Sequence, residues 1–262
     1  MNLNFFLEFL ENQFPSKYAL PGDRIGLQVH SGKGEIENLL ICHEVTPEII
    51  GEALWNKSDT ILAFHPLIYS PLQRITQEDR VGKLVSLLIL HKVSLISLHT
   101  RFDVYENGTS SLFAKELDLQ IEKFLIPNTE NEKFGMGIIG NFAEGLLFDK
   151  FIEKVHSVTK NPLRYTKGKK DKIKKIGIVG GSGTSFLDEA LANELDAMIT
   201  SDATYHTFHS VKGNMALVDP GHYETEQFIV PALYKLLKEK LANEFIGLVE
   251  SKISTNPISY FP

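Results

Sequence analysis

The chain has 262 residues, of which 43% are hydrophobic and 23% are charged, a composition typical of a folded globular protein rather than a disordered or collagen-like one. Its 27 basic and 33 acidic residues give a net charge of −6, so no molecule-wide positive field exists to attract nucleic acid or an anionic membrane. This length accommodates one large domain or two smaller lobes with real cores.

The cysteine content and the N-terminal segment indicate a cytoplasmic protein. Cys42 is the only cysteine, which excludes an internal disulfide and a thiolate zinc cluster and suits a reducing compartment. Because it lies in an apolar run, we expect it to be buried and unreactive. The segment MNLNFFLEFLENQF carries Glu8 and Glu11 but no lysine or arginine, so it predicts an amphipathic helix rather than a signal peptide. The longest apolar stretch, 84–90, is too short to span a membrane.

The first half of the chain alternates short apolar runs with helical periodicity. Strands are expected over 36–45, 60–65 and 93–99, and helices over 47–54, 79–91 and 107–117. Thr46 is expected to cap the first of these helices, with Pro47 at its first position. This alternation is typical of an α/β protein with a largely parallel sheet.

The second half repeats the rhythm. Strands are expected over 173–179, 197–200 and 215–218, and helices over 185–195 and 224–241. The polar segment 126–133, IPNTENEK, is the best candidate for a junction. We therefore expect two facing α/β lobes of similar topology with mostly parallel sheets, over 1–125 and 126–262, the closing strand being able to return to the first lobe.

Histidines stand where three of the expected strands end. His65 precedes Pro66, His99 is followed four residues later by Asp103, and His222 is followed four residues later by Glu226. Ligands of open α/β sheets bind at the carboxyl ends of strands. Each histidine also has an ordinary structural interpretation, namely a bond to a carbonyl, a surface pair or a helix cap. Taken by itself, His65 is better explained as a strand-end histidine bonded to a nearby carbonyl than as a ligand.

Together these side chains supply three imidazoles and two carboxylates, a donor set that suits a divalent transition metal. Without a thiolate, Zn, Fe, Mn or Ni are favoured over Cu(I) or an iron–sulfur cluster. Two carboxylates can also bridge a pair of ions that activates water in hydrolases. The spacing leaves open whether one ion or two is bound.

The order of several motifs resembles the Ngg-interacting-factor-three-like family, also named GTP cyclohydrolase 1 type 2. The motifs are GDRIGLQV, VTPEII, FHPLIYSPLQRI, SLHTRFD, GGSGTS, TSDATYH and DPGHYETEQF. They extend over almost the whole chain, and the length resembles the family form without an inserted middle domain.

The resemblance implies facing α/β lobes, a dinuclear metal site and a toroidal homohexamer. His65, Asp103, His222 and Glu226 match the family's metal ligands, with Glu226 as the bridge, and His99 matches a histidine beside the site. Phe64 departs from the family, which often has His-His-Pro-Leu at this point, so one ion is left short of a ligand that His99 or water would have to supply. Arg24 and Glu44 are smaller departures, where the family tends to Asn and Asp.

Two further segments carry weaker signals. Gly181, Ser182 and Gly183 follow a strand and precede a helix, where amides can hold a phosphate, although a capped tight turn is the simpler interpretation. Asp202 is expected to cap the next helix, and His206 is a candidate near the site. Six lysines between 167 and 175 are typical of a solvated hairpin rather than of nucleic-acid binding, because no aromatic residues alternate with them.

The resemblance implies a metal-dependent hydrolase of a purine nucleotide. The reaction would convert GTP to 7,8-dihydroneopterin triphosphate and formate through a metal-activated water, with His99 or His206 moving the proton. The alternative is a non-catalytic ring protein that binds divalent metal or a partner, since a fold does not fix a function. Binding of nucleic acid through the ring would depend on the lysines alone.

Overall fold

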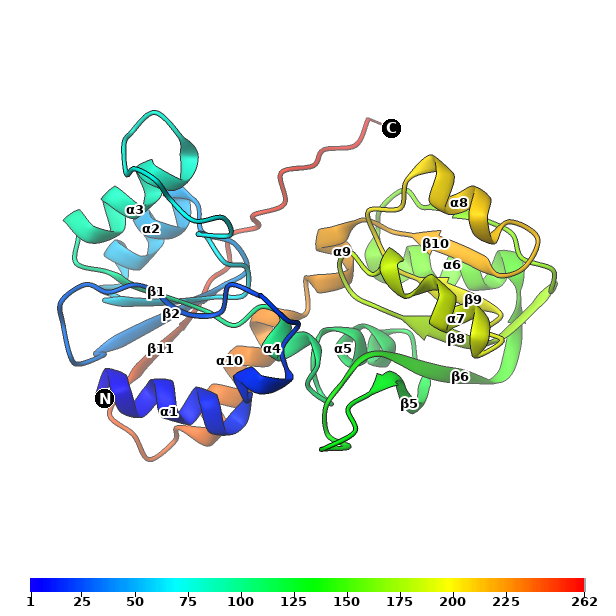
Figure 1. The fold of residues 1–262 in the computed structure, drawn as a ribbon, viewed down its shortest axis with the longest axis horizontal. Coiled ribbons are helices and arrows are strands. Elements are labelled where there is room, and N and C mark those ends of the chain that lie inside the picture. Colours follow the sequence, from blue (N-terminus) through cyan, green and yellow to red (C-terminus); the bar gives the residue numbers. More distant parts are fainter. Residues whose placement is uncertain (262) are drawn as a thin grey trace. The chain divides into compact units, whose positions relative to one another are not determined.

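The computed structural model describes residues 1–261 as a mixed α/β protein with a separate sheet in each of two compact units (Figure 1). Unit 1 comprises Met1–Phe102 and Ile229–Pro257, and unit 2 comprises Asp103–Phe228 with the C-terminal residues from Ile258. The α/β fold class expected from the alternating pattern is confirmed. Among the described residues, no helix is long and apolar enough to cross a membrane.

The sheet of unit 1 has five strands in the order β1-β4-β3-β2-β11. The strands are β1 (Gly26–Val29), β2 (Asn38–Cys42), β3 (Thr60–Ala63), β4 (Ser94–Ser97) and β11 (Gly247–Glu250). Only β1 runs antiparallel to its neighbour. All residues of β3 and β4 are buried, as expected for parallel strands covered on both faces. The carboxyl ends of β2, β3 and β4 therefore lie at one edge.

Helices and a short 3-10 turn complete unit 1. They are α1 (Leu3–Gln13), η1 (Ser16–Tyr18), α2 (Pro47–Trp55), α3 (Arg80–Leu90), α4 (Thr100–Asp103), whose last residue opens unit 2, and α10 (Ile229–Lys240). Thr46 caps α2 by accepting the Ile49 amide at 3.3 Å, with Pro47 in the first turn, which confirms the predicted start. Cys42 is fully buried, and burial raises the pKa of its thiol, so it packs as a small apolar side chain.

The sheet of unit 2 has six strands in the order β5-β6-β8-β9-β10-β7. The strands are β5 (Gln120–Pro127), β6 (Gly135–Leu147), β7 (Arg164–Thr166), β8 (Lys172–Ile178), β9 (Ala197–Ile199) and β10 (Ala216–Asp219). The three strands β8, β9 and β10 are mutually parallel, while β5, β6 and β7 pair antiparallel. This sheet is therefore mixed, and its parallel strands β8, β9 and β10 again end at one edge.

The helices of unit 2 are mostly short. They are α5 (Thr109–Glu116), α6 (Phe148–Thr159), η2 (Thr184–Phe186), α7 (Leu187–Ala192), α8 (Tyr205–Val211) and α9 (His222–Glu226). Buried residues of α5, α6 and the central strands form one apolar cluster, which includes Phe113, Phe151, Ile176 and Val218. This core fixes the strands whose ends carry polar residues.

Two segments differ from what the sequence suggests. Residues 126–133, expected as a junction, contribute the end of β5 and its connection to β6, in a hairpin inside unit 2. The helix expected over 224–241 is interrupted: α9 ends at Glu226 and α10 begins at Ile229. Phe228 packs against the core of unit 2, whereas Ile229 is fully buried and belongs to unit 1. The change of core explains why one continuous helix does not form.

Candidate metal centre

Histidines collect at the strand ends of unit 1. His43, His65 and His99 follow β2, β3 and β4, and the His65 amide donates to the His43 carbonyl at 2.9 Å. The ring centroids of His43 and His65 are 4.6 Å apart, and those of His65 and His99 are 5.6 Å apart. The parallel register thus brings together three imidazoles that lie 22 or more positions apart in the sequence.

Two of these imidazoles are held by carboxylates through the same ring nitrogen. The Nδ1 of His65 lies 3.1 Å from Oε2 of Glu44, and the Nδ1 of His99 lies 2.6 Å from Oδ1 of Asp23. Histidines that ligate metals commonly donate one ring N–H to a carboxylate in this way, which fixes the tautomer and turns the other nitrogen toward the metal. In both residues that other nitrogen is Nε2.

The carboxylates are themselves stabilised as anions. Burial opposes the ionisation of Asp23, but hydrogen bonds from His99 and Thr100 outweigh it and lower its pKa to about 2. For Glu44, burial is likewise outweighed by bonds from His65 and Arg80, which lower its pKa. The Arg80 guanidinium donates to Oε1 of Glu44 at 2.7 Å and to the Val45 carbonyl at 2.9 Å. Glu44 therefore stands between a fixed cation and a candidate ligand.

His43 was missed in the sequence because the expected strand 36–45 runs past it. Its side chain is 8% exposed. A signal was available, since the apolar run of β2 ends in a histidine as the runs of β3 and β4 do. Phe64, by contrast, is fully buried, with its ring centroid 5.5 Å from that of His43 and 5.9 Å from that of His99. Position 64 thus supplies an apolar wall beside the imidazoles.

His99 is held in an uncommon backbone conformation. Its φ is +41°, in the left-handed region that non-glycine residues seldom occupy. Asp23 fixes this corner because its Oδ2 accepts the Thr100 amide at 3.1 Å while Oδ1 contacts the His99 ring. Strain of this kind persists when its surroundings hold it in place and is concentrated at functional sites.

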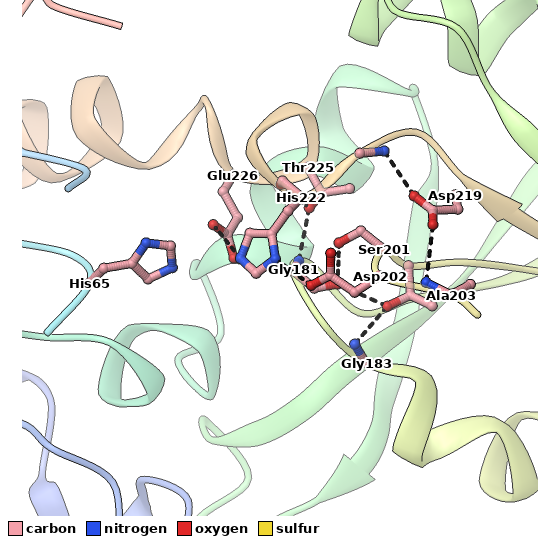
Figure 2. A network of polar contacts seen from close by, with 12 residues as sticks. His65, Gly181, Gly183, Ser201, Asp202, Ala203, Asp219, His222, Thr225 and Glu226 are labelled. Atoms are coloured by element: carbon pink, nitrogen blue, oxygen red, sulfur yellow. Dashed lines mark hydrogen bonds and ion pairs between the residues drawn. The ribbon is translucent and has the colours of Figure 1, made fainter. Parts of the chain in front are cut away.

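Unit 2 contains a second carboxylate–histidine cluster (Figure 2). The Nδ1 of His222 lies 2.7 Å from Oδ2 of Asp202, and its Nε2 lies 3.2 Å from Oε2 of Glu226. His222 and Glu226 are four residues apart at the two ends of α9, so they share a helix face, as the sequence predicts. Burial would lower the pKa of His222, but Asp202 and Glu226 together raise it to about 10.

Asp202 does not cap the following helix, contrary to expectation. Thr204 is the N-cap of α8 and accepts the Thr207 amide at 3.2 Å. Asp202 has a φ of +57°, and the bond from His222 is the main cause that lowers its pKa. It thus orients His222 as Glu44 orients His65, a role with no local sequence signal.

The glycine-rich loop after β8 makes room for Glu226. Gly181 has a φ of +64°, and a Cβ there would lie 2.4 Å from Oε1 of Glu226 and 3.3 Å from Nε2 of His222. The amides of Gly181 and Gly183 donate to Thr225 and Thr200 hydroxyls, each at 2.8 Å. Two of the amides expected to meet a phosphate are thus engaged within the protein, and the phosphate contact of Gly181, Ser182 and Gly183 stays a prediction.

Two predicted site residues have other surroundings. Asp103 is the last residue of α4 and accepts the Thr109 hydroxyl at 2.5 Å. His206 is exposed on α8, where its ring packs edge-on against Tyr205 at 5.4 Å. Neither the ligand role of Asp103 nor the catalytic role of His206 is tested by these contacts.

A pocket of about 440 Å³ opens beside the imidazoles of unit 1. Its lining includes His65, His99, Glu44, Arg80 and Tyr69. The side chain of Arg80 is 55% exposed even though it binds Glu44, so a cation and two imidazoles border the same space. Such a combination of a concave pocket with a few convergent polar groups is typical of a small-molecule site.

The donor chemistry of both clusters fits a divalent metal. Unit 1 offers two imidazoles and unit 2 offers one whose Nδ1 is held by a carboxylate, and unit 2 adds Glu226, which is 3% exposed. Fold and side chains together define an α/β protein that presents candidate metal ligands at the carboxyl ends of parallel strands.

The family follows from comparison with known proteins. The family model described as Duf34/NIF3 (NGG1p interacting factor 3) matches residues 1–257. The chain therefore belongs to the Duf34/NIF3 family, which confirms the resemblance seen in its motifs.

Similar sequences bear one name. A "GTP cyclohydrolase 1 type 2 homolog" of Lactococcus lactis is 31% identical over 97% of both chains. One from Streptococcus pneumoniae is 28% identical over 94% of both. The similarity thus extends over nearly the full length of each relative.

Solved structures share the fold. A hypothetical protein of Staphylococcus aureus superposes with a TM-score of 0.92 at 23% identity, covering 100% of this chain and 99% of that one. A Bacillus cereus protein related to NIF3 gives a TM-score of 0.91 at 22% identity over the same shares. At these identities the likeness concerns the fold alone.

Proposed function

We propose that the chain is a metal-dependent hydrolase of a purine nucleotide, converting GTP to 7,8-dihydroneopterin triphosphate and formate. The observation that carries the proposal is the repeated pairing of a strand-end histidine with a carboxylate at Nδ1, in His65, His99 and His222. The name of the relatives supports the substrate class.

The proposed ligands are His43 and His65 of unit 1 and Asp103, His222 and Glu226 of unit 2. Imidazole and carboxylate donors without a thiolate favour Zn, Fe, Mn or Ni, one or two ions per chain. A bound divalent ion would supply a water of lowered pKa as the nucleophile. Supporting the ligand role, Glu226 is buried beside His222 with its carboxylate 3.2 Å from the imidazole, an arrangement common to shared metal ligands.

His43 replaces, in this proposal, the imidazole that Phe64 does not provide. The two positions follow adjacent parallel strands, and their rings lie 5.5 Å apart. The ring of His43 also lies 4.6 Å from that of His65. The His43 imidazole therefore lies next to position 64, where the family often has the first histidine of its His-His-Pro-Leu motif.

The pocket beside His65 would take the nucleotide. Its volume of about 440 Å³ falls within the range of about 300 to 1,000 Å³ typical of small-molecule sites. Arg80 borders it with a half-exposed guanidinium, and arginine binds phosphate oxygens with two parallel hydrogen bonds. Arg80 would thus orient the triphosphate while Glu44 keeps its position.

His99 is the proposed proton carrier. It borders the pocket, and its Nδ1 is held by Asp23 at 2.6 Å, so its Nε2 would exchange a proton with the substrate. His206, the other candidate, lies on α8 of unit 2 and does not line this pocket. The proposal therefore gives the catalytic role to His99 first.

Assembly and location complete the proposal. The resemblance to the family supports a toroidal homohexamer. The single, buried cysteine supports a location in the cytoplasm. Measurement of the mass in solution by light scattering tests the assembly. A mass near six chains supports it, and a monomer or dimer mass contradicts it.

Metal content tests the ligand set. After loading with each metal and removal of excess ion, elemental analysis should give one or two ions per chain for the wild type and less for His65→Ala and His222→Ala. Full metal content in both variants contradicts the assignment. Equal losses in the two single variants and the double variant indicate shared ions, whereas additive losses indicate separate ones. Turnover of GTP then separates the enzyme from a non-catalytic metal-binding protein.

A further inference from the structure

One face of α8 is unusual for a helix that covers a sheet. Tyr205, Phe208, His209 and Lys212 stand at positions i, i+3, i+4 and i+7, which places them on one side of the helix. In α8 only Val211 is buried, so a single small side chain anchors the helix to the core. The aromatic and imidazole rings of this face, together with Lys212, lie beside strand β7.

This face borders a cavity of about 520 Å³ whose other wall is β7, the last strand of its sheet. The rings of Tyr205 and His209 meet at 4.6 Å and 63°, edge to face. Tyr205 is nevertheless 72% exposed, and Tyr165 of β7 is 49% exposed. Large aromatic surfaces are therefore fixed by neighbouring rings yet open to solvent.

The cavity is cationic in a chain of net charge −6. Arg164 and Lys212 line it, and no carboxylate is among the described residues of its lining. Arg164 donates from its terminal Nη2 to the buried Asp219, but the side chain stays 62% exposed, and its guanidinium carbon lies 5.8 Å from the centre of the Phe208 ring. Lys212 is exposed at the C-terminal end of α8.

We propose that this cavity, which we name the α8–β7 pocket, binds a mononucleotide, meaning an aromatic base that carries a phosphate. An exposed ring such as Tyr205 provides a stacking platform for any base, because every base has a π-face. Arg164 and Lys212 provide the charge that a phosphate requires. Its volume suits a ligand of this size.

A simple anion would contact only the basic side chains of the pocket, and an uncharged aromatic compound would contact only its rings. Inorganic phosphate would leave the rings of Tyr205 and Tyr165 uncovered, and a nucleoside would leave Lys212 and the exposed part of the Arg164 guanidinium without an anionic ligand. The combination of the two therefore favours a ligand with both parts. Among the described residues that line the pocket, none is fully buried, so the lining does not select one base over another.

This site is distinct from the proposed metal centre and does not depend on the proposed function. None of the residues lining it is a proposed metal ligand. Asp219 is the one indirect link described between the α8–β7 pocket and the metal ligands of unit 2. It binds Arg164 of the pocket and accepts the amide of Ala203, at 3.1 Å, which is the residue after Asp202 (Figure 2). Binding should therefore persist in the metal-free protein.

Calorimetric titration of the full chain in the presence of a chelator tests the inference, with AMP, adenosine and inorganic phosphate as probes. We expect AMP to bind with one site per chain, and adenosine and phosphate to bind at least about tenfold more weakly. Tyr205→Ala and Lys212→Glu should each weaken AMP binding about tenfold or more. Both side chains are exposed, so unchanged thermal melting shows that the variants fold.

The chain offers a matched control in unit 1. Lys238 of α10 is exposed and lies 5.7 Å from the half-buried Tyr234 ring, another pair of cation and ring. Lys238→Glu, which makes the same charge change, should bind AMP as the wild type does. Wild-type affinity in Tyr205→Ala and Lys212→Glu, or no AMP binding at millimolar concentration, would overturn the inference.

Discussion

The Nδ1 of His222 lies 2.7 Å from Oδ2 of Asp202, and the same kind of pair forms at the strand ends of unit 1. In each pair the carboxylate follows or precedes a different strand from the histidine, so tertiary structure and not local spacing creates it. Asp202 adopts a positive φ of +57° to reach His222, a conformation that aspartate tolerates better than most residues. The pair therefore indicates a positioned imidazole rather than a surface contact.

Replacement of Asp202 by Asn should weaken metal binding about 10- to 100-fold, because the orienting carboxylate of a ligating histidine contributes that much. The metal affinity is measured by competition with a chromophoric chelator. Glu153→Gln, which changes an exposed carboxylate on α6 of the same unit, is the control and should bind as the wild type. Equal affinity in Asp202→Asn contradicts the orienting role.

Replacement of Phe64 by His should increase the metal retained after removal of excess ion, because it adds a further imidazole to those of His43 and His65. The polar ring in a fully buried position should also lower the free energy of unfolding of the metal-free protein by about 1 to 3 kcal/mol. Elemental analysis and chemical denaturation measure the two effects.

Phe64→Leu serves as the comparison, since it alters packing without adding a donor. It should leave metal content unchanged. If Phe64→His also retains no more metal than the wild type, position 64 is not next to a bound ion.

Gly181→Ala should disturb the site, since a Cβ there would lie 2.4 Å from Oε1 of Glu226. Gly213→Ala is a matched control at a φ of +78° with nothing within 4 Å of the added atom. Both variants should lose about 1 kcal/mol from the left-handed backbone, but only Gly181→Ala should also lose metal affinity. Equal metal affinity in the two variants would show that Glu226 moves aside without consequence.

Arg101 should be a major stabilising residue of unit 1. Its side chain is 6% exposed, and it donates to the Phe14 carbonyl at 2.5 Å, to the Leu10 carbonyl at 3.0 Å and to Glu11 at 2.8 Å. It thereby satisfies carbonyls at the C-terminal end of α1. Arg101→Met should reduce the free energy of unfolding by about 2 to 4 kcal/mol, measured by urea denaturation.

Arg74 provides the surface comparison, because its pair with Glu78 is 74% and 75% exposed. Arg74→Met should change stability by less than about 0.5 kcal/mol. A loss of similar size in the two variants would contradict the capping role of Arg101.

Asp196 should make the stability of unit 2 depend on pH. Burial opposes its ionisation, but Lys170 and the amides of Lys174 and Lys175 outweigh this and lower its pKa. A carboxyl with a lower pKa in the folded state stabilises the protein above its unfolded pKa of about 3.9, and this contribution is lost as the pH falls below that value.

Asp196→Asn should therefore melt at a lower temperature than the wild type at pH 7, and the difference should shrink as the pH falls toward 3. Thermal melting between these pH values measures it. A difference that stays constant, or grows toward low pH, contradicts this account of Asp196.

Several residues of the candidate site could be proposed from the sequence. His65 and His99 were found because each ends an apolar run, where a polar side chain is conspicuous, and His222 because it follows such a run after a short turn. The carboxylates that bind these histidines were not recognised as their partners. Glu44, Asp23 and Asp202 lie 21, 76 and 20 residues along the chain from His65, His99 and His222, respectively. No local spacing rule connects groups so far apart.

The fold shows the same division. The buried parallel strands β2, β3 and β4 were predicted from their apolar runs, with ends shifted by a few residues. The β5–β6 hairpin was missed because its polar turn resembles a linker, and the break between α9 and α10 was missed because 224–241 is suitably periodic throughout. In both segments, residues that are neighbours in the sequence pack in different environments. The periodicity of apolar residues carries no information about such a change.

Release of formate from GTP tests the central claim most directly. Protein loaded with Zn, Mn, Fe or Ni is incubated with GTP, and formate is quantified over time beside His65→Ala and His222→Ala under the same loading. The account predicts formate release by the wild type with at least one metal, and loss of at least about 100-fold in both variants. No release with any of the four metals, or equal release by the variants, would contradict it.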